Sequence, residues 1–201
     1  MNNKNATNLI ITGVGGQGNV LAARLLASAL LAEDLEVTVG DVYGLTQRGG
    51  SVASHVRWRS QDPLPPLVPR GSLDILVAFE PLEALRVLTQ YGNENTAAIV
   101  NTAPVMPIGV QTGRFQYPSL EELQQGLDLL TGTLFMVEAT SIVQQLKNQQ
   151  VLNMVMLGAL TGSGITGIKK DTFTKVLSSL VPPKFVDINL QAFEMGVKEV
   201  C

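Results

Sequence analysis

Cysteine and histidine are almost absent from this sequence. The single cysteine, Cys201, is the last residue, and His55 is the single histidine. One cysteine can form neither an intrachain disulfide nor a zinc or iron–sulfur site whose ligands are all cysteines. A chain without disulfides is typical of a reducing compartment. We therefore expect a cytoplasmic protein that holds no metal ion of its own.

Charged side chains are also scarce. They make up 15% of the residues, whereas hydrophobic residues make up 45%, and 14 Lys+Arg against 17 Asp+Glu give a net charge of −3. A nucleic-acid-binding protein normally carries a basic face, so this balance argues against that class. A surface with few charges predicts large apolar patches and association. We expect the isolated chain to form a homo-oligomer unless a companion covers it.

No hydrophobic run is long enough to cross a membrane. The longest, Val20–Leu35, is interrupted by Arg24, Glu33 and Asp34, and a spanning helix needs about 20 apolar residues. The first residues lack the apolar core of a signal peptide. The sequence therefore predicts no membrane association, and its length suits one domain over residues 1–201.

The first 41 residues have the pattern of a Rossmann-like βαβ unit. The apolar run Asn8–Thr12 predicts a buried strand, and glycine-rich Gly13–Gly18 follows it at once. Asn19–Asp34 is rich in Ala and Leu without Pro or Gly, which predicts a helix sandwiched between layers. Glu36–Asp41 predicts a second strand. The crossover of such a unit is expected to be right-handed.

The remaining chain alternates strands and helices. Ser51–Arg59 has polar and apolar residues in strict alternation, which predicts a half-exposed strand that is antiparallel or at an edge. Further strands are predicted at Leu73–Phe79, Thr96–Asn101 and Thr133–Glu138, and helices at Pro81–Gln90, Ala139–Lys147, Val151–Leu160, Asp171–Leu180 and Asp187–Val200. Together these elements predict an α/β fold, a three-layer α/β/α sandwich with a mixed, mainly parallel sheet.

The glycine-rich turn matches the G-x-G-x-x-G pattern of dinucleotide-binding proteins. In that pattern Gly13 permits the tight turn, Gly15 lets the backbone approach a phosphate, and Gly18 lets the helix pack closely. The helix N-terminus then attracts an anion, and Asp41 could bind a ribose hydroxyl. The same glycines also suit a tight junction that binds nothing. Gln17 adds a side chain that a purely structural turn would not require.

A second motif, Gln47-Arg48-Gly49-Gly50, follows the second predicted strand. It leaves the sheet at the edge where the glycine turn lies, so Arg48 could face that turn and bind a phosphate or carboxylate. Alternatively, Arg48 is exposed or paired with another subunit. We identify no catalytic residue. His55 shares its strand face with Arg57 and Arg59 and is expected at the surface or at an interface.

The two motifs together resemble those of a known family. Gly-Val-Gly-Gly-Gln-Gly after a first strand, followed by Gln-Arg-Gly-Gly-Ser-Val, is similar to the gamma-type subunit of 2-oxoacid:ferredoxin oxidoreductases, and most like the beta subunits of the indolepyruvate branch. The resemblance covers nearly the whole chain. That branch often has Glu, an aliphatic residue and His where this chain has Asp41-Val42-Tyr43, which leaves the 2-oxoacid open.

The resemblance implies a subunit of an enzyme that oxidatively decarboxylates a 2-oxoacid to an acyl-CoA and reduces ferredoxin. It assigns thiamine diphosphate and iron–sulfur clusters to a larger companion subunit, so this chain should be inactive alone and could line the CoA side of the active site. The family motifs match these residues: Gly13, Gly15, Gly16, Gln17, Gly18, Arg48, Gly49 and Gly50. From the pattern alone, an NAD(P)-dependent dehydrogenase and a purely structural scaffold stay as alternatives.

Overall fold

A six-stranded mixed sheet forms the centre of the protein. The computed structural model describes residues 6–43, 50–59, 64–106 and 116–200. The strands are β1 Thr7–Val14, β2 Glu36–Tyr43, β3 Ser51–Arg59, β4 Ile75–Ala78, β5 Ala97–Asn101 and β6 Thr133–Val137. Their order in the sheet is β2-β3-β1-β4-β5-β6, and β3 runs antiparallel to both of its neighbours, whereas the other pairs are parallel.

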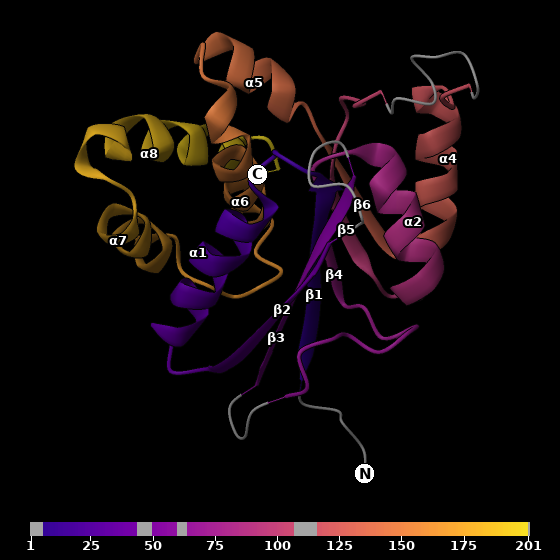
Figure 1. Ribbon diagram of the computed structural model, residues 1–201, viewed down its shortest axis with the longest axis horizontal. Coiled ribbons are helices and arrows are strands. Elements are labelled where there is room, and N and C mark those ends of the chain that lie inside the picture. The colour runs from indigo at the N-terminus through magenta and orange to yellow at the C-terminus, as the bar shows by residue number, and fades with distance from the viewer. Residues whose placement is uncertain (1–5, 44–49, 60–63, 107–115, 201) are drawn as a thin grey trace.

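Helices cover both faces of the sheet and complete three layers (Figure 1). They are α1 Asn19–Leu31, α2 Pro81–Tyr91, α4 Leu120–Leu130, α5 Ala139–Gln145, η1 Gln149–Val151, α6 Leu152–Gly162, α7 Lys170–Leu180 and α8 Pro183–Lys198. Helices α1, α5, α6, α7 and α8 lie on one side, which we call the first side, and α2 and α4 lie on the second side. The predicted fold class is therefore confirmed. No helix among the described residues is long and apolar enough to span a bilayer.

The opening βαβ unit differs from its predicted form in one respect. Strands β1 and β2 are parallel, as expected, but β3 lies between them and pairs with each over eight residue pairs. The sequence pattern predicts the direction of β3 correctly and its burial wrongly. Six of its nine residues are buried, because the proline-rich segment, residues 64–72, packs over its face on the second side. There Arg57 donates to the carbonyl oxygens of Pro65 (2.8 Å) and Leu67 (3.1 Å).

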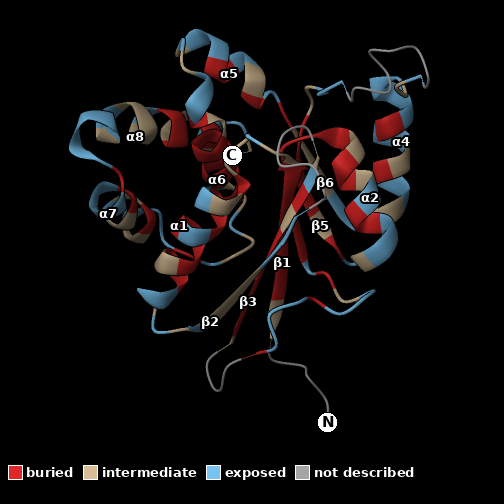
Figure 2. Ribbon diagram, viewed as in Figure 1, coloured by how far each residue is buried: buried red, intermediate tan, exposed pale blue. Residues whose placement is uncertain are grey.

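The two sides of the sheet have different cores (Figure 2). Alternate strand residues such as Leu9, Ile11 and Val77 point to the first side, where they join a large apolar cluster with α1, α6 and α8. Their neighbours Ile10 and Leu76 point to the second side, into a smaller cluster with α2. Because successive residues of a strand point to opposite faces, the same short strands contribute side chains to both cores.

Helices α6 and α8 cross unusually closely on the first side. A Cβ atom built on Gly158 would lie 2.1 Å from the carbonyl oxygen of Phe193, and one on Gly196 would lie 2.0 Å from that of Val155. Neither distance is compatible with a side chain, so both positions require glycine for the close approach of two backbones. Phe193 also stacks on Phe173 of α7, with the ring centroids 5.0 Å apart.

Helix α4 is absent from the elements predicted from the sequence. Its N-terminus carries a capping box in which Ser119 and Glu122 satisfy each other's backbone N–H groups. This Ser-x-x-Glu signal precedes a short stretch with only two buried residues, Leu123 and Leu127. Leu120, Leu123, Leu127 and Leu130 recur at the spacing of one helix face, so this spacing and the capping box were both available signals for the helix.

Candidate functional site

The glycine-rich turn joins β1 to α1 at the carboxyl edge of the sheet. Gly16 and Gly18 adopt positive φ angles of 106° and 87°, a region that side-chain-bearing residues rarely adopt. Gly13 instead lies within β1, where its missing side chain leaves room for the Gln17 amide and the Phe79 Cβ atom. Gly18 lies against Asn153 of α6. The turn therefore needs its glycines, but for partly different reasons than the sequence pattern predicts.

The two sequence motifs meet at Gly50. The Gly15 N–H donates to the Gly50 carbonyl oxygen at 2.9 Å, so the end of the second motif is bonded directly to the glycine turn. Gln47, Arg48 and Gly49 lie outside the described residues. The bond also uses the Gly15 N–H, which the pattern would reserve for a phosphate. The predicted anion pocket thus stays a prediction, with the N–H groups at the start of α1 as its remaining backbone donors.

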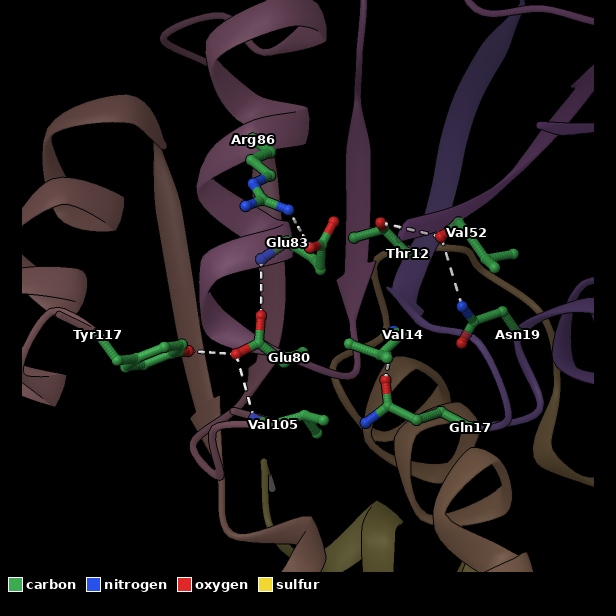
Figure 3. A network of polar contacts seen from close by, with 10 residues as sticks. All are labelled: Thr12, Val14, Gln17, Asn19, Val52, Glu80, Glu83, Arg86, Val105 and Tyr117. Carbon is green, nitrogen blue, oxygen red and sulfur yellow. Dashed lines mark hydrogen bonds and ion pairs between the residues drawn. The ribbon is translucent and has the colours of Figure 1, made fainter. Parts of the chain in front are cut away.

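Gln17 braces the turn from within. Its side-chain oxygen accepts from the Val14 N–H (2.7 Å), and its amide nitrogen donates to the Phe79 carbonyl oxygen (3.1 Å) at the end of β4. Figure 3 shows the side chain folded back toward Val14. Asn101, at the end of β5, donates to the same Phe79 oxygen at 3.1 Å. Amide side chains therefore hold the ends of three parallel strands in register at this edge.

A cavity of about 300 Å³ opens beside the turn. Its lining residues come from the turn, from the segments after β5 and β6, and from the start of α6: Gly16, Gln17, Asn101, Ala103, Pro104, Val105, Thr140, Gln149 and Leu152. Ligands of open α/β sheets bind in this position, beyond the carboxyl ends of parallel strands. The cavity is therefore the candidate functional site. Sequence reasoning located the turn and Gln17 but missed Asn101 and Thr140, because their strand and helix carry no motif.

A buried carboxylate next to the cavity is a second feature that the sequence reasoning missed. Glu80 is 2% exposed and caps the N-terminus of α2, where it accepts from the Glu83 N–H at 2.8 Å. Its other oxygen accepts from the Val105 N–H (3.3 Å) and from the Tyr117 hydroxyl (Figure 3). Burial and the bond to Glu80 raise the pKa of Tyr117, so its hydroxyl stays a donor. The sequence did carry a signal for this cap: Glu80 directly precedes Pro81, and proline favours the first position of a helix.

Two other candidate residues lie away from the site. The Asp41 carboxylate accepts from the Ser54 hydroxyl at 2.5 Å, and β3 separates its strand from the glycine turn. His55 was expected at the surface or at an interface and is instead buried within the chain, at 1% exposed. Its Nδ1 accepts from the Val68 N–H at 3.1 Å, and its ring packs against Tyr91. Burial and the nearby Arg57 lower the pKa of His55. Its role is therefore structural, beneath the proline-rich segment.

The described residues contain no cluster of metal ligands. Among them, no three His, Cys, Asp or Glu residues are grouped so that they could hold a metal ion. Cys201 lies outside the described residues. Glu80 accepts hydrogen bonds through both of its oxygens, and Glu83 Oε1 pairs with Arg86, whereas Glu83 Oε2 is buried without a hydrogen-bond partner.

Comparison with known proteins gives consistent matches over the full chain. The model of the family "Pyruvate ferredoxin/flavodoxin oxidoreductase" matches residues 8–199. The indolepyruvate oxidoreductase subunit IorB of Thermococcus kodakarensis is 38% identical over 95% of this chain and 94% of its own length. The subunit of the same name from Methanothermobacter thermautotrophicus is 31% identical over 94% of this chain and 95% of its own length.

Solved structures share the fold. The gamma subunit of a keto/oxoacid ferredoxin oxidoreductase from Geobacter sulfurreducens superposes with a TM-score of 0.69 and 21% identity, over 96% of this chain and 98% of that chain. The 2-oxoglutarate:ferredoxin oxidoreductase from Magnetococcus marinus gives a TM-score of 0.72 and 20% identity over 98% of this chain but only 31% of that chain. The same fold therefore occurs both as a separate chain and as one part of a longer polypeptide.

Proposed function

The chain belongs to the pyruvate ferredoxin/flavodoxin oxidoreductase family, and we propose that it is the small subunit of a 2-oxoacid:ferredoxin oxidoreductase of the indolepyruvate type. The observation that carries this proposal is the end-to-end match, at 31–38% identity, to relatives named indolepyruvate oxidoreductase subunit IorB. The pyruvate synthase subunit PorC of Methanothermobacter thermautotrophicus is only 27% identical. An aryl pyruvate is therefore favoured over pyruvate as the substrate.

We assign the decarboxylation and electron-transfer steps of the complex to the companion subunit. Oxidative decarboxylation of a 2-oxoacid to an acyl-CoA, with electrons passed to ferredoxin, needs thiamine diphosphate and iron–sulfur clusters. This chain has one cysteine, and its described residues contain no cluster of metal ligands, which supports placing the iron–sulfur clusters on a larger subunit. We place the complex in the cytoplasm, because a chain with one cysteine suits a reducing compartment. The role of this chain is to complete that complex. Without its companion, we expect it to self-associate through its apolar surface.

A free NAD(P)-dependent dehydrogenase is the weaker alternative. A dinucleotide site needs an acidic residue at the end of the strand beside the first one. Here β3 is the neighbour of β1, and Asp41 lies one strand further away with its carboxylate bonded to Ser54. The Gly15 N–H is also bonded to Gly50 rather than open to a pyrophosphate.

We further propose that the glycine turn and the Gln47–Gly50 loop bind a phosphate of CoA. The bond from Gly15 to Gly50 joins the loop to the turn, and the start of α1 offers N–H groups and the positive end of a helix dipole. Arg48 would add a fixed positive charge. The Magnetococcus marinus structure of this fold was determined with coenzyme A bound.

Reconstitution tests the overall function. The chain, co-produced with its companion subunit, should give a complex that reduces ferredoxin faster with indolepyruvate than with pyruvate, and only when CoA is present. Neither subunit alone should be active. A chain that purifies without any companion from its native cells, or that reduces NAD(P) by itself, would contradict the proposal.

Arg48→Ala tests the anion pocket in the same complex. Loss of a charge-assisted contact worth about 1.5–3 kcal/mol should raise the KM for CoA roughly ten- to a hundredfold, while the KM for the oxoacid stays unchanged. Arg70→Ala is the matched control, because Arg70 is an exposed arginine in the segment before β4. An unchanged KM for CoA in an intact Arg48→Ala complex would show that the turn and loop are structural.

A further inference from the structure

A short segment separates two cavities at the carboxyl edge of the sheet. Residues Thr102–Met106, which we call the partition, follow β5 without regular secondary structure. On one side lies the cavity of about 300 Å³ beside the glycine turn, lined by Ala103, Pro104 and Val105. On the other side lies an apolar cavity of about 220 Å³ that includes Pro104, Met106 and Tyr117. The position of the partition therefore sets the width of the candidate site.

Hydrogen bonds tie the partition to β6 at its start and to the N-cap of α2 at Val105. At its start, the Thr102 N–H donates to the Val137 carbonyl oxygen of β6 at 3.0 Å. Three residues later, the Val105 N–H donates to the Glu80 carboxylate at 3.3 Å. Pro104, between them, has no N–H to donate. The Val105 N–H is thus held by the side chain that caps α2 rather than by a sheet ladder.

Glu80 makes more contacts than a helix cap requires. One carboxylate oxygen accepts from the Glu83 N–H, and that bond alone caps the helix. The other oxygen accepts from Val105, in the partition, and from the hydroxyl of Tyr117, which precedes α4. Figure 3 shows Glu80 between these two groups, with the Gln17 side chain beyond Val105. An aspartate or serine would serve equally well as the cap, but neither reaches as far.

We propose that Glu80 is a positioning residue that holds the partition at the width needed to bind CoA. This inference rests on the proposed function of the glycine-turn cavity. A buried carboxylate needs several donors to offset the loss of its hydration, so Glu80, Val105 and Tyr117 fix one another. Loss of the bond to Glu80 lets Val105 shift at the wall of the cavity, and small displacements of a binding wall reduce affinity steeply.

Glu80→Asp separates the two roles of this side chain. Aspartate is a preferred N-cap, so α2 should stay capped, but its carboxylate lies one methylene short of Val105 and Tyr117. Tyr117→Phe removes only the hydroxyl. Glu121→Asp, at an exposed acid in the first turn of α4, is the matched control. In the isolated chain, amide hydrogen exchange at Val105 should speed up about tenfold or more in both test variants and stay unchanged in the control.

The reconstituted complex supplies the decisive measurement. Glu80→Asp and Tyr117→Phe should each raise the KM for CoA about tenfold, with kcat nearly unchanged. Faster exchange at Val105 with an unchanged KM would overturn the proposal and leave Glu80 as a purely structural clamp. If Arg48→Ala raises the KM and the Glu80 variant does not, this inference alone is wrong. If neither variant changes it, the CoA pocket itself is wrong, and the role of Glu80 is wrong with it.

Discussion

The two sides of the sheet are stabilised in different ways. On the first side, α1, α6 and α8 pack through apolar side chains, and α6 and α8 meet backbone to backbone at Gly158 and Gly196. On the second side, the core is smaller and contains buried charged and polar groups, among them Arg57, His55 and Glu80. The stability of the first side therefore depends on close packing of apolar surfaces, whereas that of the second side depends on directed hydrogen bonds.

The buried charges of the second side hold segments that lack secondary structure. Arg57 donates to two carbonyl oxygens of the proline-rich segment that covers β3. Glu80 accepts from the partition beside the candidate site. Prolines keep both segments out of a sheet ladder, and charged side chains bond their backbone groups instead: Arg57 donates to carbonyl oxygens, and Glu80 accepts from an N–H group. The comparison indicates that the first side provides most of the stability and that the second side positions the loops.

The largest expected effect is on the first side. Gly196→Ala would place a Cβ atom 2.0 Å from a backbone oxygen of α6, which forces the two helices apart. Overpacking costs about 1–3 kcal/mol and sometimes more, and we expect a loss at or above the top of that range. Urea unfolding of this variant should be compared with that of Gln191→Ala, an exposed position on the same helix. Equal midpoints for the two variants would contradict close packing at this crossing.

A smaller but still large effect is expected from Arg57→Met. This change keeps the apolar stem and removes the guanidinium, so Asn8 Oδ1 and the carbonyl oxygens of Pro65 and Leu67 lose their donor. A buried group left without its partner costs about 1–3 kcal/mol. The control is Arg70→Met, at an exposed arginine. Limited proteolysis should cut the Arg57→Met variant first within the proline-rich segment. Preferential cutting in α8 would show instead that the first side had loosened.

The smallest effect is a pH dependence that arises at His55. Burial and Arg57 lower its pKa, while Asp41 opposes this shift. The folded state therefore resists protonation that the unfolded state accepts. Above a pH of about 6.5, the ordinary pKa, both states are neutral and His55 contributes no pH dependence. Below it, stability should fall by at most about 1.4 kcal/mol per pH unit, until the folded-state pKa is reached.

His55→Gln is the control for this titration. Its side-chain oxygen can still accept from the Val68 N–H, but it carries no titrating group. Unfolding free energies of the two proteins between pH 7 and pH 5 should diverge as the pH falls, with the steeper decline in the protein that retains His55. Parallel curves would show that His55 gains its proton as readily in the folded state as in the unfolded one.

The sequence predicted the first side better than the second. Helices such as Asn19–Leu31 and the buried strands are encoded by local apolar patterns, and these elements were placed to within a few residues. The position of β3 between β1 and β2 depends on long-range pairing that no local pattern records. The burial of His55 follows from the proline-rich segment packing over it. That contact joins a strand to a loop, and neither carries a signal for the other.

The candidate site was also predicted in part. The glycine turn carries a recognisable spacing, and Gly15 bonds to Gly50 at the end of the second motif, while the anion pocket stays a prediction. Glu80 and Asn101 reach the site only because β4 and β5 end at the same edge of the sheet. Their contribution depends on strand order, so it could not be found from spacing along the chain.

The placement of α1 beneath the last helices determines when the chain can complete its fold during synthesis. Helix α1 is made early, but its apolar surface packs against α6 and α7, and Thr172 of α7 donates to Glu33 just after α1 at 2.5 Å. Because α8 packs over α6, the core of the first side stays incomplete until residues near Gly196 leave the ribosome. A nascent chain therefore exposes the Ala- and Leu-rich surface of α1 until the helices that cover it have been made.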